Sequence, residues 1–220
     1  MKILVISKDN IWTTKLIQLL RKEDYDCIHT SICSKELIKK INPNWIFFFH
    51  WSDIVPKELY DNHKCIVIHT GRLPNDRGGS PIQNQILNKI THTKVNAIEM
   101  KEQLDSGAIY HSIPITLQGS LTDIWMSIAY TTHKLINYCV TFNPTPILQQ
   151  GKSYTYKRIK DNQIKFDSSN NLFDIYDQIR MVDHESYPNA YIDIGEYRIE
   201  FSRAKITNNN IITDAKITKN

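Results

Sequence analysis

The sequence predicts an α/β fold: a Rossmann-like, mostly parallel sheet covered by helices, with a small C-terminal helix and β-hairpin appended. Short apolar runs of strand length, K-I-L-V-I from residue 2, W-I-F-F-F from residue 45 and C-I-V-I from residue 65, alternate with stretches of helical periodicity. Such alternation is typical of parallel strands that helices bury on both faces. No G-x-G-x-x-G fingerprint follows the first strand, which argues against a dinucleotide site of that kind.

Each element has its own local signal. Ser34 is a natural N-cap for a short helix through Lys40, and Ser80 is one for a second helix, with Pro81 in its first turn and Gln83 closing a capping box. The remaining predictions are strands at 95–100 and 108–115 around a tight turn at 104–107, a packing helix from Ser120, a helix at 172–182, a hairpin about Gly195 and an optional edge strand at 211–217.

Composition bounds the class of protein. The chain has 220 residues, 41% of them hydrophobic, and a net charge of +4 spread along its length, which argues against nucleic acid as the default partner and fits an anionic small molecule. Four scattered cysteines without a C-x-x-C pair indicate a reducing compartment. With neither a signal peptide nor a membrane span in the sequence, we expect a soluble, cytoplasmic protein without a membrane partner. The histidines show no metal-ligand spacing, so we expect no metal.

Titratable chemistry concentrates between Cys65 and Asp105. The buried strand at 65–68 ends in His69 at the rim of the sheet, and a turn 36 residues later carries Asp105, from which a carboxylate can reach back. A histidine has a pKa suited to moving protons near neutral pH, and a carboxylate can orient its ring. These residues predict acid–base transfer chemistry at the sheet rim.

The same stretch resembles a known family. It carries H-x-x-x-L-P-x-x-R-G-x-x-P-I from His69 to Ile82 and L-D-S-G at 104–107. These motifs resemble the formyltransferases that use a formyl-tetrahydrofolate donor, a family that includes methionyl-tRNA, glycinamide ribonucleotide and nucleotide-sugar N-formyltransferases. The resemblance implies N10-formyltetrahydrofolate as co-substrate, His69 as acid and base, and Asp105 as its partner. It also implies folate contacts, for which we select His50, Trp51, Leu73, Pro74, Gly78 and Gly79.

The sequence departs from the family pattern at Val67. The family usually carries asparagine two residues before the histidine, where its amide helps to hold the formyl oxygen. Valine offers no side-chain hydrogen bond, so the oxyanion would need backbone N–H groups, water, Thr70 or another histidine such as His50. A catalytically impaired homologue that binds folate or a nucleotide sugar is the alternative.

The acceptor is predicted from the C-terminal region. Y-K-R at 156–158, I-R-M-V at 179–182 and Y-P-N-A at 187–190 resemble segments of the sugar N-formyltransferases, and the region is too short and too mixed in charge for the RNA-binding domain of a tRNA enzyme. We therefore expect a catalytic domain at 1–145 and a substrate-binding region at 146–220. The expected acceptor is dTDP-4-amino-4,6-dideoxyglucose, with a UDP- or CMP-linked amino sugar second, and the expected assembly is a homodimer without nucleic acid. The candidate substrate contacts are Lys8, Tyr156, Arg180 and Tyr187.

Overall fold

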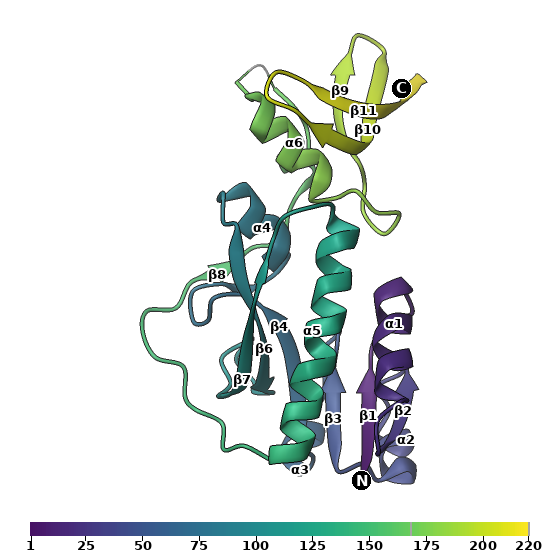
Figure 1. The fold of residues 1–220 in the computed structure, drawn as a ribbon, viewed down its shortest axis with the longest axis vertical. Coiled ribbons are helices and arrows are strands. Elements are labelled where there is room, and N and C mark those ends of the chain that lie inside the picture. Colours follow the sequence, from purple (N-terminus) through teal and green to yellow (C-terminus); the bar gives the residue numbers. More distant parts are fainter. Residues whose placement is uncertain (168, 220) are drawn as a thin grey trace. The chain divides into compact units, whose positions relative to one another are not determined.

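The structure is a computed structural model that describes residues 1–167 and 169–219 (Figure 1). The chain divides into two compact units, and each unit draws on segments that are far apart in the sequence. The first unit comprises Met1–Gly78, Thr93–Ile115 and Met126–Thr155, and the second comprises Gly79–His92, Thr116–Trp125 and Tyr156–Asn220.

A six-stranded sheet forms the centre of the first unit, in the order β2-β1-β3-β4-β6-β7. Its strands are β1 Lys2–Ile6, β2 Asp26–Thr30, β3 Trp45–Phe48, β4 Cys65–Thr70, β6 His92–Glu99 and β7 Ile109–Thr116. The pairs β1/β2, β1/β3 and β3/β4 are parallel, whereas β4 and β6 are antiparallel. The predicted mostly parallel sheet is confirmed.

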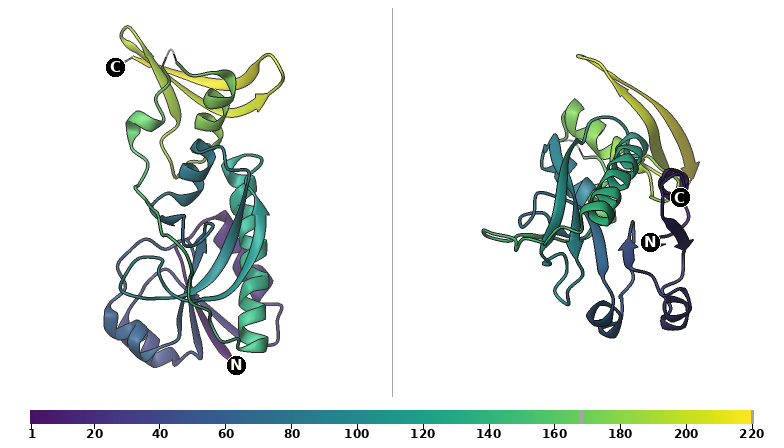
Figure 2. Two further views of the ribbon diagram at one scale, coloured as in Figure 1. Left: turned by 90° about the vertical axis from the view of Figure 1, so that its left-hand side faces the viewer. Right: turned by 60° about the horizontal axis from the view of Figure 1, so that its bottom comes forward.

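Helices cover both faces of this sheet, as predicted. Figure 2 shows α1 (Ile11–Leu20) and α5 (Leu121–Phe142) on one face, and α2 (Lys35–Ile41) and α3 (Lys57–Asn62) on the other. Because side chains alternate along a strand, β1 and β3 contribute to two apolar layers. One layer includes Leu4, Ile6, Ile38, Ile46, Phe48, Leu59 and Cys65. Ser34 caps α2 as expected, since its Oγ accepts a hydrogen bond from the N–H of Leu37 at 3.2 Å.

The second unit holds the C-terminal sheet and its helices. Antiparallel strands β9 (Ala190–Ile194), β10 (Tyr197–Ile206) and β11 (Ile211–Lys219) lie in the order β11-β10-β9, so the optional edge strand exists and pairs with the predicted hairpin. This unit includes α4 (Pro81–Leu87), α6 (Leu172–Arg180), a 3-10 turn, η1, at Asp161–Gln163 and the first residues of α5. Phe166 stacks on Phe201 of β10 with ring centroids 5.3 Å apart.

The start of α4 differs from its prediction. Ser80 has a left-handed backbone with φ 46 and makes no side-chain cap, although Pro81 occupies the first turn as expected. The Ser80 hydroxyl instead accepts from the N–H of Ile159 at 3.3 Å, and the Gln83 amide donates to the carbonyl of Met181 at 3.3 Å. The predicted capping box is therefore wrong, because partners distant in sequence take both side chains.

Two further expectations concern organisation. The boundary at residue 145 stays a prediction, and the two compact units interleave along the chain on either side of it. None of the helices within 1–167 and 169–219 combines the length and the apolar character that a membrane span requires.

The burial of β3 gives a stability test of the first unit. Replacing Ile46, which is fully buried, with alanine should lower the free energy of unfolding by about 2–5 kcal/mol, because it removes apolar contact and leaves a cavity. Urea denaturation measures this loss. The matched control is Ile32→Ala, since Ile32 is 63% exposed and its truncation should change stability by less than about 0.5 kcal/mol. Equal losses in the two variants would contradict the assigned core.

Candidate functional site

His69 lies at the carboxyl end of β4, where parallel α/β sheets commonly place ligand-binding side chains. Its side chain is only 6% exposed, and its Nε2 lies 2.6 Å from the backbone oxygen of Asp76. A carbonyl oxygen can only accept a hydrogen bond, so Nε2 is the donor in this contact, and in the neutral imidazole Nδ1 then carries the lone pair. Gly71 makes room for the arrangement, because a Cβ there would lie 2.7 Å from the Asp76 oxygen and 2.9 Å from Nε2.

Asp105 faces the other ring nitrogen. Its Oδ2 lies 3.4 Å from Nδ1 of His69, and the carboxylate is as buried as the imidazole. The same oxygen accepts a hydrogen bond of 2.9 Å from the N–H of Gly78. Asp105 adopts a left-handed backbone with φ 52, which turns the chain sharply between β6 and β7. The structure thus brings together the two residues that the sequence predicted as a pair.

The loop between His69 and α4 is braced by an internal ion pair. The buried carboxylate of Asp76 accepts hydrogen bonds from Arg72 through its backbone N–H at 2.9 Å, its Nε at 2.8 Å and its Nη2 at 3.2 Å. Bidentate pairs of this kind fix geometry as well as contribute energy. The Asp76 carbonyl that holds His69 is therefore itself held in place.

Two polar residues that the sequence did not single out support the pair. Asn96, opposite His69 in the β4/β6 ladder, donates from its amide to the carbonyls of His69 at 3.1 Å and Gly71 at 2.7 Å. Gln149 accepts from the guanidinium of Arg77 and donates to the carbonyls of Asp105 and Gly107. Neither residue lies in a recognisable motif, and nothing in the local sequence signals such long-range partners.

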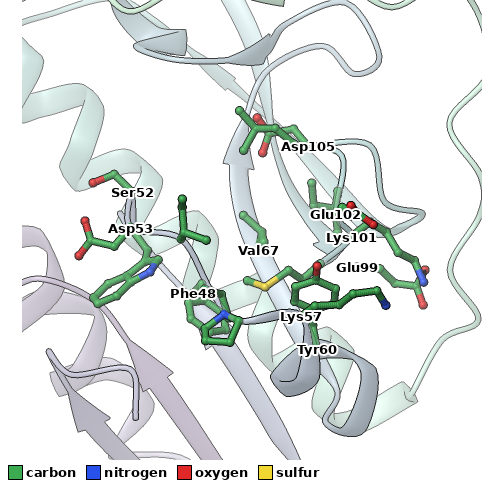
Figure 3. A pocket seen from close by; sticks show the side chains of 17 residues that line it. Phe48, Ser52, Asp53, Lys57, Tyr60, Val67, Glu99, Lys101, Glu102 and Asp105 are labelled. Atoms are coloured by element: carbon green, nitrogen blue, oxygen red, sulfur yellow. Dashed lines mark ion pairs between the residues drawn. The ribbon is translucent and has the colours of Figure 1, made fainter. Parts of the chain in front are cut away.

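A cavity of about 450 Å³ opens beside Asp105, lined by residues from β3, the loop after it, α3, β4, β6 and the turn that follows β6. Figure 3 shows Phe48 and Val67 along the cavity, with Asp105 at one end of the group. Val67 and His69 are two residues apart on one strand and therefore share a face of the sheet. The cavity thus extends along the face that carries the imidazole.

Among the predicted folate contacts, the cavity lining includes Trp51 and omits His50, Leu73, Pro74, Gly78 and Gly79. His50 packs edge-on against Trp12, and its Nδ1 lies 3.4 Å from the Asn10 amide. Leu73 and Pro74 belong to the loop after β4, and Gly78 donates its N–H to Asp105. A Cβ on Gly79 would lie 2.6 Å from Cγ of Arg158, so this glycine permits close packing within the second unit.

The predicted substrate contacts are dispersed. Lys8 forms an exposed ion pair with Asp53 at 3.5 Å, and Tyr156 is buried in the short strand β8 (Thr155–Tyr156). Arg180 donates to the carbonyls of Leu117 and Gly119 and to Asp177, which ties α6 to the segment before α5. Burial raises the pKa of Tyr187. Roles for these four residues in binding stay predictions.

Within 1–167 and 169–219, no group of three or more histidine, cysteine, aspartate or glutamate side chains is placed to hold a metal ion.

Comparison with known proteins gives consistent matches. Residues 160–218 match a family model described as the C-terminal domain of methionyl-tRNA formyltransferase. The methionyl-tRNA formyltransferase of Campylobacter jejuni subsp. doylei is 36% identical over 100 residues, covering 45% of this chain and 33% of that protein. The methionyl-tRNA formyltransferase of Geobacillus sp. is 33% identical over 174 residues, and the match covers 74% of this chain and 54% of that protein. This chain therefore spans a third to about half of the length of these curated relatives.

Solved structures match over more of the chain. A methionyl-tRNA formyltransferase from Clostridium thermocellum superposes with a TM-score of 0.92 at 36% identity, and the match covers 100% of both chains. HypX from Aquifex aeolicus in complex with tetrahydrofolic acid superposes with a TM-score of 0.78 at 16% identity, and the match covers 93% of this chain and 38% of that one. A sugar N-formyltransferase from Shewanella sp. superposes with a TM-score of 0.66 at 23% identity, and the match covers 87% of this chain and 92% of that one. At these low identities, the HypX and sugar N-formyltransferase structures show only that this chain has the same fold.

These matches correct two predictions. The nucleotide-linked amino sugar is wrong as acceptor, and so is the exclusion of a nucleic acid partner, because the relatives of substantial identity are methionyl-tRNA formyltransferases. The exclusion of nucleic acid rests on the shortness of the C-terminal region and on its mixed overall balance of charge. That balance hides a local run of cations at 157–160, and the region matches the C-terminal domain model of the tRNA enzymes.

Proposed function

This chain belongs to the formyltransferase family that includes the methionyl-tRNA formyltransferases, and from that premise we propose that it formylates the amino group of methionine carried on tRNA. The formyl donor is N10-formyltetrahydrofolate, which enzymes of this family use. The observation that carries the proposal is the buried His69–Asp105 pair beside a cavity at the carboxyl edge of the sheet.

The cavity suits the pterin end of the donor. Its volume of about 450 Å³ lies within the range of small-molecule sites, roughly 300–1,000 Å³. Phe48, Trp51, Tyr60 and Met100 supply apolar and aromatic walls, which favour a flat heteroaromatic ring. Asp105 belongs to this lining and faces His69, so a donor held in the cavity would lie beside the catalytic pair.

His69 and Asp105 then have different roles in the proton transfers. The methionine nitrogen attacks the formyl carbon and forms a C–N bond, and the tetrahedral adduct must lose a proton from that nitrogen. Nδ1 of His69 is the ring atom able to accept it, since Nε2 donates to the Asp76 carbonyl. The carboxylate of Asp105 stabilises the resulting imidazolium, which returns the proton to N10 of the folate as the old C–N bond breaks.

The acceptor side of the proposal rests on the second unit. Lys157, Arg158 and Lys160 are exposed and make no ion pair with an acidic side chain in the described part of the chain. Asn84 holds this segment to α4 by donating to the carbonyl of Lys157 at 2.9 Å. A run of exposed cations on a backbone held by Asn84 supports binding to the phosphates of an RNA stem.

Turnover tests the catalytic roles. His69→Ala and Asp105→Asn should each lower kcat by about a hundredfold or more, because each removes one part of the proton-transfer pair. Formylation of Met-tRNA with N10-formyltetrahydrofolate, followed by acid gel electrophoresis or mass spectrometry, measures the rates. His184→Ala serves as a histidine control outside the first unit. A wild-type protein that binds folate and Met-tRNA without turnover would contradict the proposal.

Position 67 offers a gain-of-function test. Val67→Asn restores the amide that the family carries beside the formyl oxygen, and one oxyanion donor can be worth about a hundredfold in rate. We expect kcat to rise at least severalfold while the KM for folate changes little. Val67→Leu, which adds bulk without an amide, is the control and should not raise kcat. A rate unchanged in the asparagine variant would mean that another group already stabilises the oxyanion.

Salt dependence tests the RNA contact. Replacing Lys157, Arg158 and Lys160 together with alanine should weaken binding of Met-tRNA and reduce the slope of log K against log salt by about 2 to 3, since each phosphate contact contributes nearly one. The control variant removes Lys216 and Lys219, which pair with Glu200 and Glu196. An unchanged slope in the triple variant would exclude this segment from the RNA interface.

A further inference from the structure

Gln149 lies in the segment that follows α5 and makes four hydrogen bonds within the first unit. Its Oε1 accepts from Nε of Arg77 at 3.1 Å and from Nη2 at 2.7 Å. Its Nε2 donates to the carbonyls of Asp105 and Gly107, each at 2.8 Å. One side chain therefore joins the loop after β4 to the turn after β6.

That turn is where the proposed catalytic carboxylate originates. It lies between the end of β6 at Glu99 and the start of β7 at Ile109, outside the strands of the sheet. Its backbone is constrained: Asp105 has a positive φ, and a Cβ on Gly107 would lie 1.9 Å from the carbonyl oxygen of Glu99. A turn in such a conformation persists when surrounding contacts fix it.

The loop on the other side is equally fixed. Arg77 is 9% exposed, and its N–H donates to the carbonyl of Tyr154 at 3.1 Å. The next residue, Gly78, donates to Oδ2 of Asp105, the oxygen that faces His69. Loop and turn are thus joined twice, once through the carboxylate itself and once through Gln149.

We propose that Gln149 is a positioning residue that holds the turn at 105–107 against the loop at 77–78 and so fixes the Asp105 carboxylate in front of His69. The inference concerns the same site as the proposed function and rests on it for the catalytic consequence. Glutamine suits the position because its amide both accepts from a cation and donates to two carbonyls. Glutamate retains the first role and loses the second, and methionine retains only the length.

The first experiment separates rate from binding. Gln149→Met should lower kcat by about ten- to a hundredfold, because a displacement of about 1 Å in a catalytic group can cost that much. The KM for the folate donor should change less than about threefold. Gln149→Glu should recover part of the rate through its contact with Arg77. Gln150→Met is the matched control, since Gln150 is exposed and adjacent in sequence, and it should behave as wild type.

A double-mutant cycle tests whether Gln149 acts through Asp105. On an Asp105→Asn background, Gln149→Met should cost less than threefold in kcat, because the group it positions is already lost. An undiminished cost on that background would overturn the proposal and assign Gln149 a general packing role. Thermal melting of each variant verifies that the fold survives.

Hydrogen exchange tests the geometry without turnover. Peptides that span residues 100–108 should exchange faster in Gln149→Met than in the wild type, whereas Gln150→Met should leave them unchanged. Unaltered exchange would overturn the positioning role even if the wild type is active. Faster exchange in a protein that never formylates Met-tRNA would retain the positioning role and reject the proposed function.

Discussion

The contact between a buried imidazole and a buried carboxylate is the constraint on which the rest of the site depends. His69 comes from β4 and Asp105 from the turn between β6 and β7, and their largely buried side chains approach to 3.4 Å. An unpaired charge in such a place is costly, so each group needs partners on its remaining atoms. The Asp76 carbonyl partners Nε2 of His69, and the Gly78 N–H donates to Oδ2 of Asp105. The Gln149 amide holds the backbone carbonyl of Asp105.

Much of the fold follows from local sequence patterns. The apolar runs at 3–6, 45–48 and 65–68 predict the buried strands. The pair His69 and Asp105 is predictable because a strand end and a turn carry these two residues. Ser34 caps its helix because both partners lie within four residues. Where the residues that determine an element lie close together in the chain, periodicity and capping rules are enough to predict that element.

What the sequence could not supply are contacts between distant segments. Ser80 bonds Ile159 instead of capping α4, and Gln149 bridges residues more than forty positions away. The acceptor class is also wrong: short motifs, the length of the C-terminal region and its mixed charge indicate a sugar enzyme, whereas the relatives of substantial identity are methionyl-tRNA formyltransferases. Electrostatic recognition depends on where cations cluster and whether acids neutralise them, which the total charge does not report.

Gly71 limits how this site can diverge. The space that a side chain would need is already filled by the imidazole and the Asp76 carbonyl, so even alanine is excluded without moving one of them. Arg72, Asp76 and Arg77 are committed to bonds of their own, whereas Asn75 faces solvent. Substitution at Asn75 can therefore leave the contacts that hold His69 intact, whereas substitution at Gly71 cannot.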